Sequence, residues 1–296
     1  MFSTTSTTIP VTHHRTATVE GLTIFYREAG PADAPVVVLL HGFPSSSHMY
    51  RNLIPALADR YRVIAPDLPG FGLSAMPPRE EFEYSFAKFA DIVDGLLQQL
   101  GAERYALYVM DYGAPTGFRL ALAHPGRVAA LITQNGNAYE DGLQAFWDPI
   151  KALWADNSKA HRDALRHFMT PEITKFQYVD GVKDVSRLDP AAWLYDQLFL
   201  DRPGNVEIQL DLFYDYRNNV ALYPRFQEFF RTHKPPTLIA WGANDSIFPA
   251  EGARAFLRDL PDAELHLLDS GHFAFEDKAD EIVPLLRDFL ARHLPA

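Results

Sequence analysis

The sequence predicts an α/β fold in which a mostly parallel sheet is covered by helices on both faces. Strand patterns alternate with helix patterns from about residue 36 onward, a rhythm that is typical of parallel sheets. Between residues 105 and 124 a strand pattern, a very sharp turn and a helix pattern follow one another directly. Residues 138–222 interrupt the alternation before it resumes near residue 237.

The first half of the sheet region begins with a hairpin. Its turn is Glu20-Gly21, because turn residues there separate two runs with strand character. Short apolar runs predict the later strands, and the long amphipathic stretch that Gly101 closes predicts a helix. In chain order we expect strands at 16–19, 22–28 and 36–40, a helix at 49–58, a strand at 62–65, a helix at 84–100, a strand at 106–110, a helix at 113–124 and a strand at 128–133.

After the interruption the same two patterns return. We expect a strand at 237–241, a helix at 250–260, a strand at 264–268 and a helix at 280–293. Residues 138–222 instead indicate several helices without a buried strand, and they are rich in aromatic residues. Because an insertion of this length is rarely structureless, it predicts a helical cap over the strand ends. The predicted domains are a core (1–137 and 223–296) and this cap (138–222).

Composition narrows the function classes. The chain has 296 residues, 47% of them apolar, which is enough for a large core with a cap. The absence of cysteine excludes disulfides and thiol chemistry. A net charge of −11 argues against nucleic acid or an anionic membrane as a partner. Without a signal-peptide pattern in residues 1–10 or a bilayer-length apolar run, we expect a cytoplasmic enzyme. The oligomeric state stays open, and a homo-oligomer is compatible with the sequence.

The sharp turn places Asp111 at its tip. A strand-turn-helix arrangement of this kind holds one side chain out at the end of a sheet, where it can attack a substrate. Gly113 and Ala114 are small, which lets the helix approach the strand closely. Most turns of this kind carry serine, so a carboxylate here predicts a different reaction.

Three further segments complete a predicted site around Asp111. The backbone N–H groups of Phe43, in His41-Gly42-Phe43-Pro44, and of Tyr112 are expected to form an oxyanion hole. Asp245 and His272 each follow a predicted strand, at the sheet edge where open α/β sheets place their sites. Taken singly, each motif has an ordinary explanation, such as a turn or a helix N-cap. Their joint order of nucleophile, acid and histidine favours a catalytic set.

With these motifs the chain resembles the α/β-hydrolase superfamily over nearly its whole length. The aspartate nucleophile is similar to the branch that holds epoxide hydrolases and haloalkane dehalogenases. The resemblance implies that Asp111 attacks a saturated, polarised carbon and forms an alkyl ester of the enzyme. His272, oriented by Asp245, would then activate water to hydrolyse that ester. The expected partners are a small apolar or aromatic organic substrate and water, with no cofactor and no metal.

Leaving-group chemistry separates the two activities of this branch. His41-Gly42-Phe43-Pro44 is similar to the epoxide hydrolase motif, and Tyr112 stands where dehalogenases typically have tryptophan. Tyr216, in Tyr216-Arg217-Asn218, resembles one of the two cap tyrosines that open the epoxide, and we expect Tyr178 to be the second. Ordinary packing in the cap would explain both tyrosines as well.

Other features of the sequence favour the second activity or a different class. Val109 and the stretch 113–118 are similar to dehalogenases. We therefore expect an epoxide hydrolase first and a haloalkane dehalogenase second. A carboxylesterase is disfavoured because no serine stands at the turn. A ligand-binding protein without turnover is disfavoured because Asp111, Asp245 and His272 are all present, although fold alone does not fix function.

Overall fold

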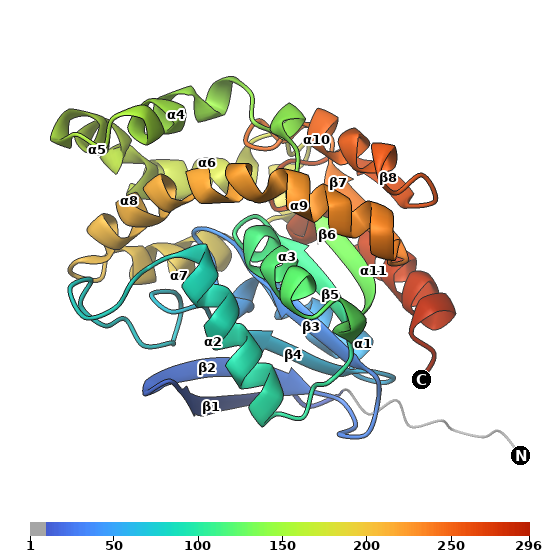
Figure 1. Cartoon of the computed structure of the whole chain (residues 1–296). Helices are drawn as coiled ribbons and strands as arrows, with labels where there is room; N and C mark the ends of the chain where they lie inside the picture. The colour runs from blue at the N-terminus through green and yellow to red at the C-terminus, as the bar shows by residue number, and fades with distance from the viewer. Residues whose placement is uncertain (1–9) are drawn as a thin grey trace, which may run out of the picture.

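The computed structural model describes residues 10–296, so the N-terminal segment in which we expected no signal peptide lies mostly outside it. An eight-stranded sheet with the order β1-β2-β4-β3-β5-β6-β7-β8 forms its centre (Figure 1). β1 pairs with β2, and β2 with β4, in antiparallel fashion, and the remaining pairs are parallel. The strands are β1 (His13–Val19), β2 (Leu22–Ala29), β3 (Val36–Leu40), β4 (Arg62–Pro66), β5 (Tyr105–Met110), β6 (Val128–Gln134), β7 (Thr237–Gly242) and β8 (Glu264–Leu268).

Helices cover both faces of the sheet, because β3 and β5 at its centre are apolar at every position. Along β5, Tyr105, Leu107 and Val109 pack with residues of α2 (Phe86–Gln99) and α3 (Gly113–Ala123). The residues between them pack on the opposite face with α1 (Leu53–Leu57) and α11 (Ala274–His293). Successive side chains of a strand point to opposite faces, so one short run contributes to both cores. The expected fold class, a mostly parallel sheet between helical layers, is confirmed.

The cap consists of short helices gathered above one end of the sheet (Figure 1). The 222/223 boundary that we predicted falls inside α9, so it marks no break in the backbone, and the division into core and cap stays a prediction. In chain order the region contains η3 (Glu140–Gly142), η4 (Ala145–Trp147), α4 (Asp148–Ala155), α5 (Lys159–Leu165), η5 (Arg166–Met169), α6 (Pro171–Val179), η6 (Val185–Arg187), α7 (Pro190–Leu200), α8 (Asn205–Asp215) and the first part of α9 (Arg217–His233).

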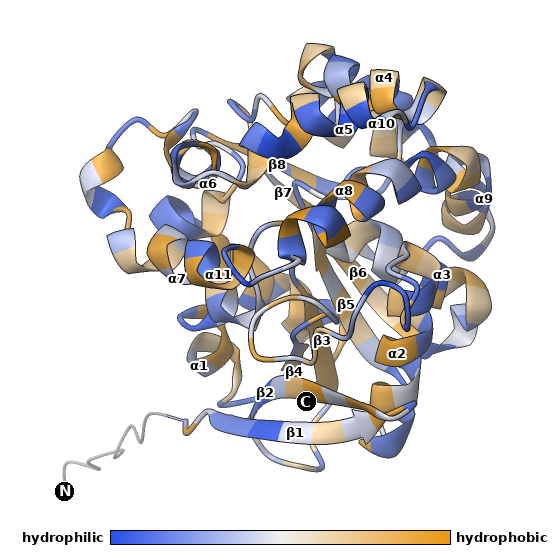
Figure 2. Cartoon of the chain, turned by 90° about the vertical axis from the view of Figure 1, so that its left-hand side faces the viewer, coloured by the Kyte–Doolittle hydropathy of each residue, from blue (hydrophilic) through white to orange (hydrophobic). Residues whose placement is uncertain are grey.

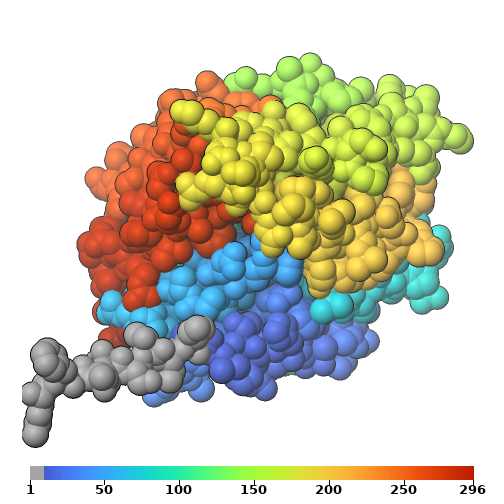
Figure 3. Space-filling view, turned by 180° about the vertical axis from the view of Figure 1, so that it is seen from behind, coloured from blue at the N-terminus to red at the C-terminus, as the bar shows by residue number. Residues whose placement is uncertain are grey.

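The cap lies directly on the sheet domain. Coloured by hydropathy, the central strands are largely apolar, whereas the outer helices alternate between polar and apolar residues (Figure 2). From behind, the segment containing α6 and α7, in yellow, lies against the light-blue segment near residue 50 (Figure 3).

In the part of the chain that the structure describes, no helix has the length and apolar character to cross a membrane.

Candidate active site

Asp111 occupies the sharp turn that the sequence predicted. β5 ends at Met110, Asp111 has a left-handed backbone with φ of 48°, and α3 begins at Gly113. This conformation is unfavourable for a residue with a side chain, so the surrounding structure must enforce it. A Cβ at Gly113 would lie 2.1 Å from the carbonyl oxygen of Leu40, which leaves room only for glycine. The tight contact between α3 and the sheet thus fixes the direction of the Asp111 side chain.

The loop after β3 holds one of the two Asp111 oxygens. The backbone N–H of Phe43 donates to Oδ1 of Asp111 at 2.6 Å, and the N–H of Tyr112 also hydrogen-bonds to this carboxylate. Gly42 permits this approach, since a Cβ there would lie 2.3 Å from Cβ of Asp111. The two N–H groups expected to form the oxyanion hole are therefore directed at the Asp111 carboxylate.

His272 and Asp245 stand on the other side of Asp111. Nδ1 of His272 lies 2.8 Å from Oδ2 of Asp245, and its Nε2 lies 3.8 Å from Oδ2 of Asp111. Nε2 has no hydrogen-bond partner among residues 10–296. All three residues are buried, with exposed fractions of 5% or less. The structure brings the three predicted catalytic residues together, and Nε2 of His272 is too far from the Asp111 carboxylate for a direct hydrogen bond.

Asn135 is a further residue of this site that sequence reasoning missed. It follows β6 with φ of 47° and is fully buried. Its amide donates to Oδ2 of Asp245 at 2.7 Å, and its Oδ1 accepts the N–H of Gly242 at 3.0 Å. The N–H of Ile247 donates to the other Asp245 oxygen at 2.7 Å. Asn135 and Ile247 together fix the orientation of the carboxylate that holds His272. The one signal in the sequence that could have identified Asn135 was its position at a strand end beside Asp111.

Burial and charge set the protonation of the site. Burial raises the pKa of Asp111 to about 6, against the opposing effects of His272 and the two N–H donors. For His272, burial lowers the pKa, but the Asp245 carboxylate outweighs it, and the net pKa is raised. Low-dielectric surroundings disfavour an isolated charge and favour a charge that has a partner. At neutral pH, Asp111 is therefore ionised in a mostly dry environment, as a nucleophile requires.

A narrow pocket lies beside Asp111, between the core and the cap. Aromatic and branched aliphatic side chains form most of its wall, and Asp111 is its one charged residue. Such a wall favours a neutral, apolar ligand. The lining residues are Phe43, Asp111, Tyr112, Phe146, Trp147, Ile150, Phe168, Gln177, Phe213 and Ile247.

The two tyrosines predicted as leaving-group donors do not line this pocket. Tyr178 donates its hydroxyl to Asp196 and stacks on Phe273, with ring centroids 4.0 Å apart. The hydroxyl of Tyr178 is thus already bound to a cap carboxylate, and its assignment as a leaving-group donor stays a prediction. Tyr216 is fully buried one layer behind Trp147, at 4.6 Å between rings, and its hydroxyl faces that of Tyr223 at 3.4 Å. In this conformation neither hydroxyl is directed at a ligand beside Asp111.

Two other lining residues carry unpartnered hydrogen-bond donors. The hydroxyl of Tyr112 and Nε2 of Gln177 are buried without a hydrogen-bond partner among residues 10–296. Trp147 also lines the pocket, but its indole N–H donates to the carbonyl of Ile247 at 2.8 Å. Since buried donors are usually paired, Tyr112 and Gln177 are candidates for contact with a ligand.

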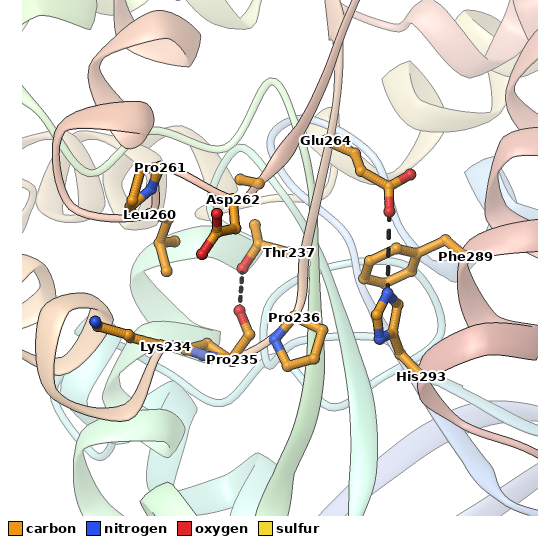
Figure 4. Close-up of a pocket in the computed structure, with 11 residues that line it drawn as sticks. Lys234, Pro235, Pro236, Thr237, Leu260, Pro261, Asp262, Glu264, Phe289 and His293 are labelled. Atoms are coloured by element: carbon orange, nitrogen blue, oxygen red, sulfur yellow. Dashed lines mark hydrogen bonds and ion pairs between the residues drawn. The ribbon is translucent and has the colours of Figure 1, made fainter.

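A second hollow lies at the opposite edge of the sheet and is not the catalytic site. It is built where β7 and β8 begin, whereas Asp245 and His272 follow the ends of these strands (Figure 4). The hydroxyl of Thr237 donates to the carbonyl of Pro235, and His293 lies 3.9 Å from Glu264. Residues 10–296 also contain no group of three His, Asp or Glu side chains placed to hold a metal ion.

Comparisons with known proteins identify the family of the fold. The family model described as alpha/beta hydrolase fold matches residues 35–279. An uncharacterised hydrolase of Saccharomyces cerevisiae is 44% identical over 93% of this chain and 97% of its own length. A cis-3-alkyl-4-alkyloxetan-2-one decarboxylase of Xanthomonas campestris is 31% identical, over 92% of this chain and 94% of its own.

Solved structures show the same architecture. An epoxide hydrolase of Vigna radiata superposes with a TM-score of 0.75 at 23% identity, covering 95% of this chain and 98% of its own. A haloalkane dehalogenase of Bradyrhizobium elkani superposes with a TM-score of 0.69 at 24% identity, covering 96% and 99%. At these identities the superpositions support the fold and leave the reaction to be argued from the site.

Proposed function

The chain belongs to the alpha/beta hydrolase fold family, and we propose that it is a hydrolase that opens epoxides to diols through a covalent ester on Asp111. The observation that carries this proposal is the unequal environment of the two Asp111 oxygens. Oδ1 accepts the N–H of Phe43 at 2.6 Å, whereas Oδ2 faces Nε2 of His272 at 3.8 Å. An ionised carboxylate in this setting suits attack on a saturated carbon, since attack on an acyl group would give an anhydride.

The proposed reaction has two steps. In the first, Oδ2 of Asp111 bonds to an epoxide carbon, the carbon–oxygen bond breaks, and its electron pair moves to the ring oxygen, which takes a proton. In the second, His272 removes a proton from water, and the hydroxide adds to the ester carbonyl carbon of Asp111. The negative charge then develops on Oδ1, where the N–H groups of Phe43 and Tyr112 stabilise it. The bond between the carbonyl carbon and Oδ2 then breaks, and the diol leaves with Oδ2, which takes the proton from His272.

The unpartnered donors favour an epoxide over a haloalkane. An opening epoxide needs an O–H group, and the hydroxyl of Tyr112 is buried beside the pocket without a partner. A departing halide is commonly held by a tryptophan N–H, but that of Trp147 is already bound to Ile247. We propose Tyr112 in the role first expected for Tyr178, with Tyr216 behind it at 6.2 Å between rings.

Haloalkane dehalogenation stays the second candidate. The amide N–H of Gln177 is a donor of the kind that a halide accepts, and it lines the same pocket. In either reaction the substrate is a neutral, compact, apolar or aromatic molecule, because the wall offers no cation to pair with a charged ligand.

The test is intact-protein mass spectrometry of a His272→Ala variant incubated separately with neutral epoxides, haloalkanes and a 2-oxetanone. Without the base the ester on Asp111 should accumulate. The 2-oxetanone is included because the Xanthomonas relative is named for such a ring. The control is the double variant that also carries Asp111→Asn.

Each adduct identifies one chemistry. An increase equal to the whole epoxide mass, absent from the double variant, supports epoxide opening. An increase equal to the haloalkane less its hydrogen halide points to dehalogenation instead. An ester formed only with the oxetanone would move the proposal to four-membered rings. If no substrate gives an adduct, an alkyl-enzyme mechanism is wrong for this chain. Turnover of p-nitrophenyl esters that requires Asp111 would favour the carboxylesterase.

A further inference from the structure

We propose that Gln177, a cap residue on α6, binds the ring oxygen as the epoxide opens. The inference rests on the proposed function and names a catalytic contact that the sequence did not indicate. Gln177 is 3% exposed, lines the pocket that contains Asp111, and has an unpartnered Nε2. It is the one polar residue that the cap contributes to this wall.

The geometry of α6 explains why Gln177 rather than Tyr178 reaches the pocket. Neighbouring residues on an α-helix point about 100° apart, so the two side chains cannot share one direction. Tyr178 packs on Phe273 and bonds to Asp196. Thr174, three residues before Gln177, donates to Gln197 of α7 at 2.7 Å. Both of these side chains are bound inside the protein, which leaves Gln177 as the polar group that α6 directs at the pocket.

Gln197, a buried glutamine on the neighbouring helix α7, is by contrast fully engaged. Nε2 of Gln197 donates to the carbonyl of Met169 at 3.1 Å and to Asp201 at 2.7 Å, and its oxygen accepts from Thr174. Buried amides are normally satisfied in this way. An amide that is buried, unpartnered and next to a nucleophile is therefore best explained by a partner that arrives with the substrate.

An amide N–H suits the charge that develops in the first step. As the carbon–oxygen bond breaks, the electron pair moves to the ring oxygen, and a hydrogen bond from Nε2 becomes stronger as that oxygen becomes negative. Gln177 transfers no proton, because an amide is not an acid at neutral pH. The proton comes from the hydroxyl of Tyr112, which is restored during ester hydrolysis by the second proton of the attacking water. Stabilisation realised mainly in the transition state raises the rate of the step.

The experiment measures how fast the ester forms. In the His272→Ala background, the time course of adduct formation with styrene oxide is followed by intact mass for the parent, Gln177→Leu and Gln177→Met. Leucine and methionine preserve much of the volume and remove the donor. Gln197→Leu is the matched control, because it removes an equally buried cap glutamine away from the pocket. Circular dichroism checks that each variant is folded.

Loss of a hydrogen bond to a charged oxygen should slow ester formation by about 10- to 100-fold in both Gln177 variants. Gln197→Leu should form the ester at close to the parent rate. With His272 restored, hydrolysis of the ester should be unchanged in Gln177→Met, because that step uses the oxyanion hole. A merely structural role would slow both steps together.

The outcomes separate the two proposals. If the parent forms the styrene oxide ester and both Gln177 variants form it equally fast, the role of Gln177 is overturned and the proposed function stands. If Gln197→Leu slows the step as much as the Gln177 variants do, the effect is one of cap packing and the inference fails. If the parent forms no ester with any epoxide, the proposed function fails first, and this inference fails with it.

Discussion

At the scale of single residues, the two oxygens of the Asp111 carboxylate have different neighbours. Oδ1 accepts the N–H of Phe43 at 2.6 Å, whereas Oδ2 lies 3.8 Å from Nε2 of His272. Burial holds the pKa of the carboxyl at about 6, and His272 opposes this rise. The first step needs Asp111 ionised, so its rate should report this pKa directly.

We predict that ester formation in the His272→Ala variant decreases as the pH falls, with a midpoint somewhat above about 6. Protonation removes the nucleophile below this midpoint, and loss of His272 removes an interaction that lowers the pKa of Asp111. The measurement is the initial rate of adduct formation at a series of pH values. The variant with Asp111→Asn corrects for acid-catalysed ring opening. A rate that stays constant down to about pH 5 would contradict the burial of Asp111.

At the scale of the secondary structure elements, α7 contacts the core through a buried carboxyl group, that of Asp196. Asp196 on α7 is 2% exposed and accepts the hydroxyl of Tyr178, with Ser45 beside it. Burial raises its pKa from 3.8 to about 7. Glu276 also raises this pKa, whereas Arg51, which pairs with Glu276 at 2.8 Å, lowers it. The contact joins the cap to the loop that supplies Phe43.

We predict that, as the pH rises, the Asp196→Asn variant loses less of its free energy of unfolding than the natural protein does. A carboxyl with a raised pKa contributes its full stability below about pH 4, and the contribution is lost as the pH rises through about 7. Asparagine does not ionise, so between about pH 5 and pH 8 the variant should gain on the natural protein by roughly 1–4 kcal/mol.

The measurement for Asp196 is thermal unfolding at several pH values. Asp201→Asn, an exposed carboxylate next to the end of α7, is the control and should follow the natural protein. Parallel curves for the natural protein and Asp196→Asn would show that burial of this carboxyl has no net effect on stability.

A helix or strand could be predicted from the sequence where a short local pattern of residues determines it. The strand Val36–Leu40 was predicted to the residue, because a short apolar run suffices for a buried strand. The helix expected at 49–58 is instead two short pieces, η1 (Ser47–Tyr50) and α1. The last helix starts at Ala274, and its backbone is non-helical at Lys278, so the regular pattern was visible only from Asp280.

The residues of the candidate site could be predicted where they belong to a recognisable sequence motif. Asp111, Asp245 and His272 stand at strand ends, and strand ends are readable from hydrophobic runs. Gln177 and Asn135 were missed because their roles depend on the rotation of α6 and on a contact between neighbouring strands. The sequence could not place Tyr178 relative to the pocket for the same reason, since aromatic residues are expected in a pocket and in a packed cap alike.

At the level of the whole molecule, the cap has no core separate from that of the sheet. One continuous apolar cluster includes Leu40 and Val109 of the sheet together with Trp147 and Phe213 of the cap. Aromatic contacts also cross the boundary, such as Phe43 with Phe213 at 5.3 Å between ring centroids. Elements that share buried surface lose it together, which favours cooperative unfolding.

We predict that cap and core unfold in a single transition. Three of the four tryptophans, Trp147, Trp154 and Trp193, lie in residues 138–222, so fluorescence reports mainly the cap, whereas circular dichroism reports the whole chain. Equilibrium denaturation should give the same midpoint with both probes. Repeating it with Trp241→Phe removes the remaining core tryptophan and should leave the two curves coincident, although at a lower midpoint, because Trp241 is fully buried. A fluorescence transition that precedes the loss of circular dichroism would show instead that the cap unfolds by itself, as a separate domain would.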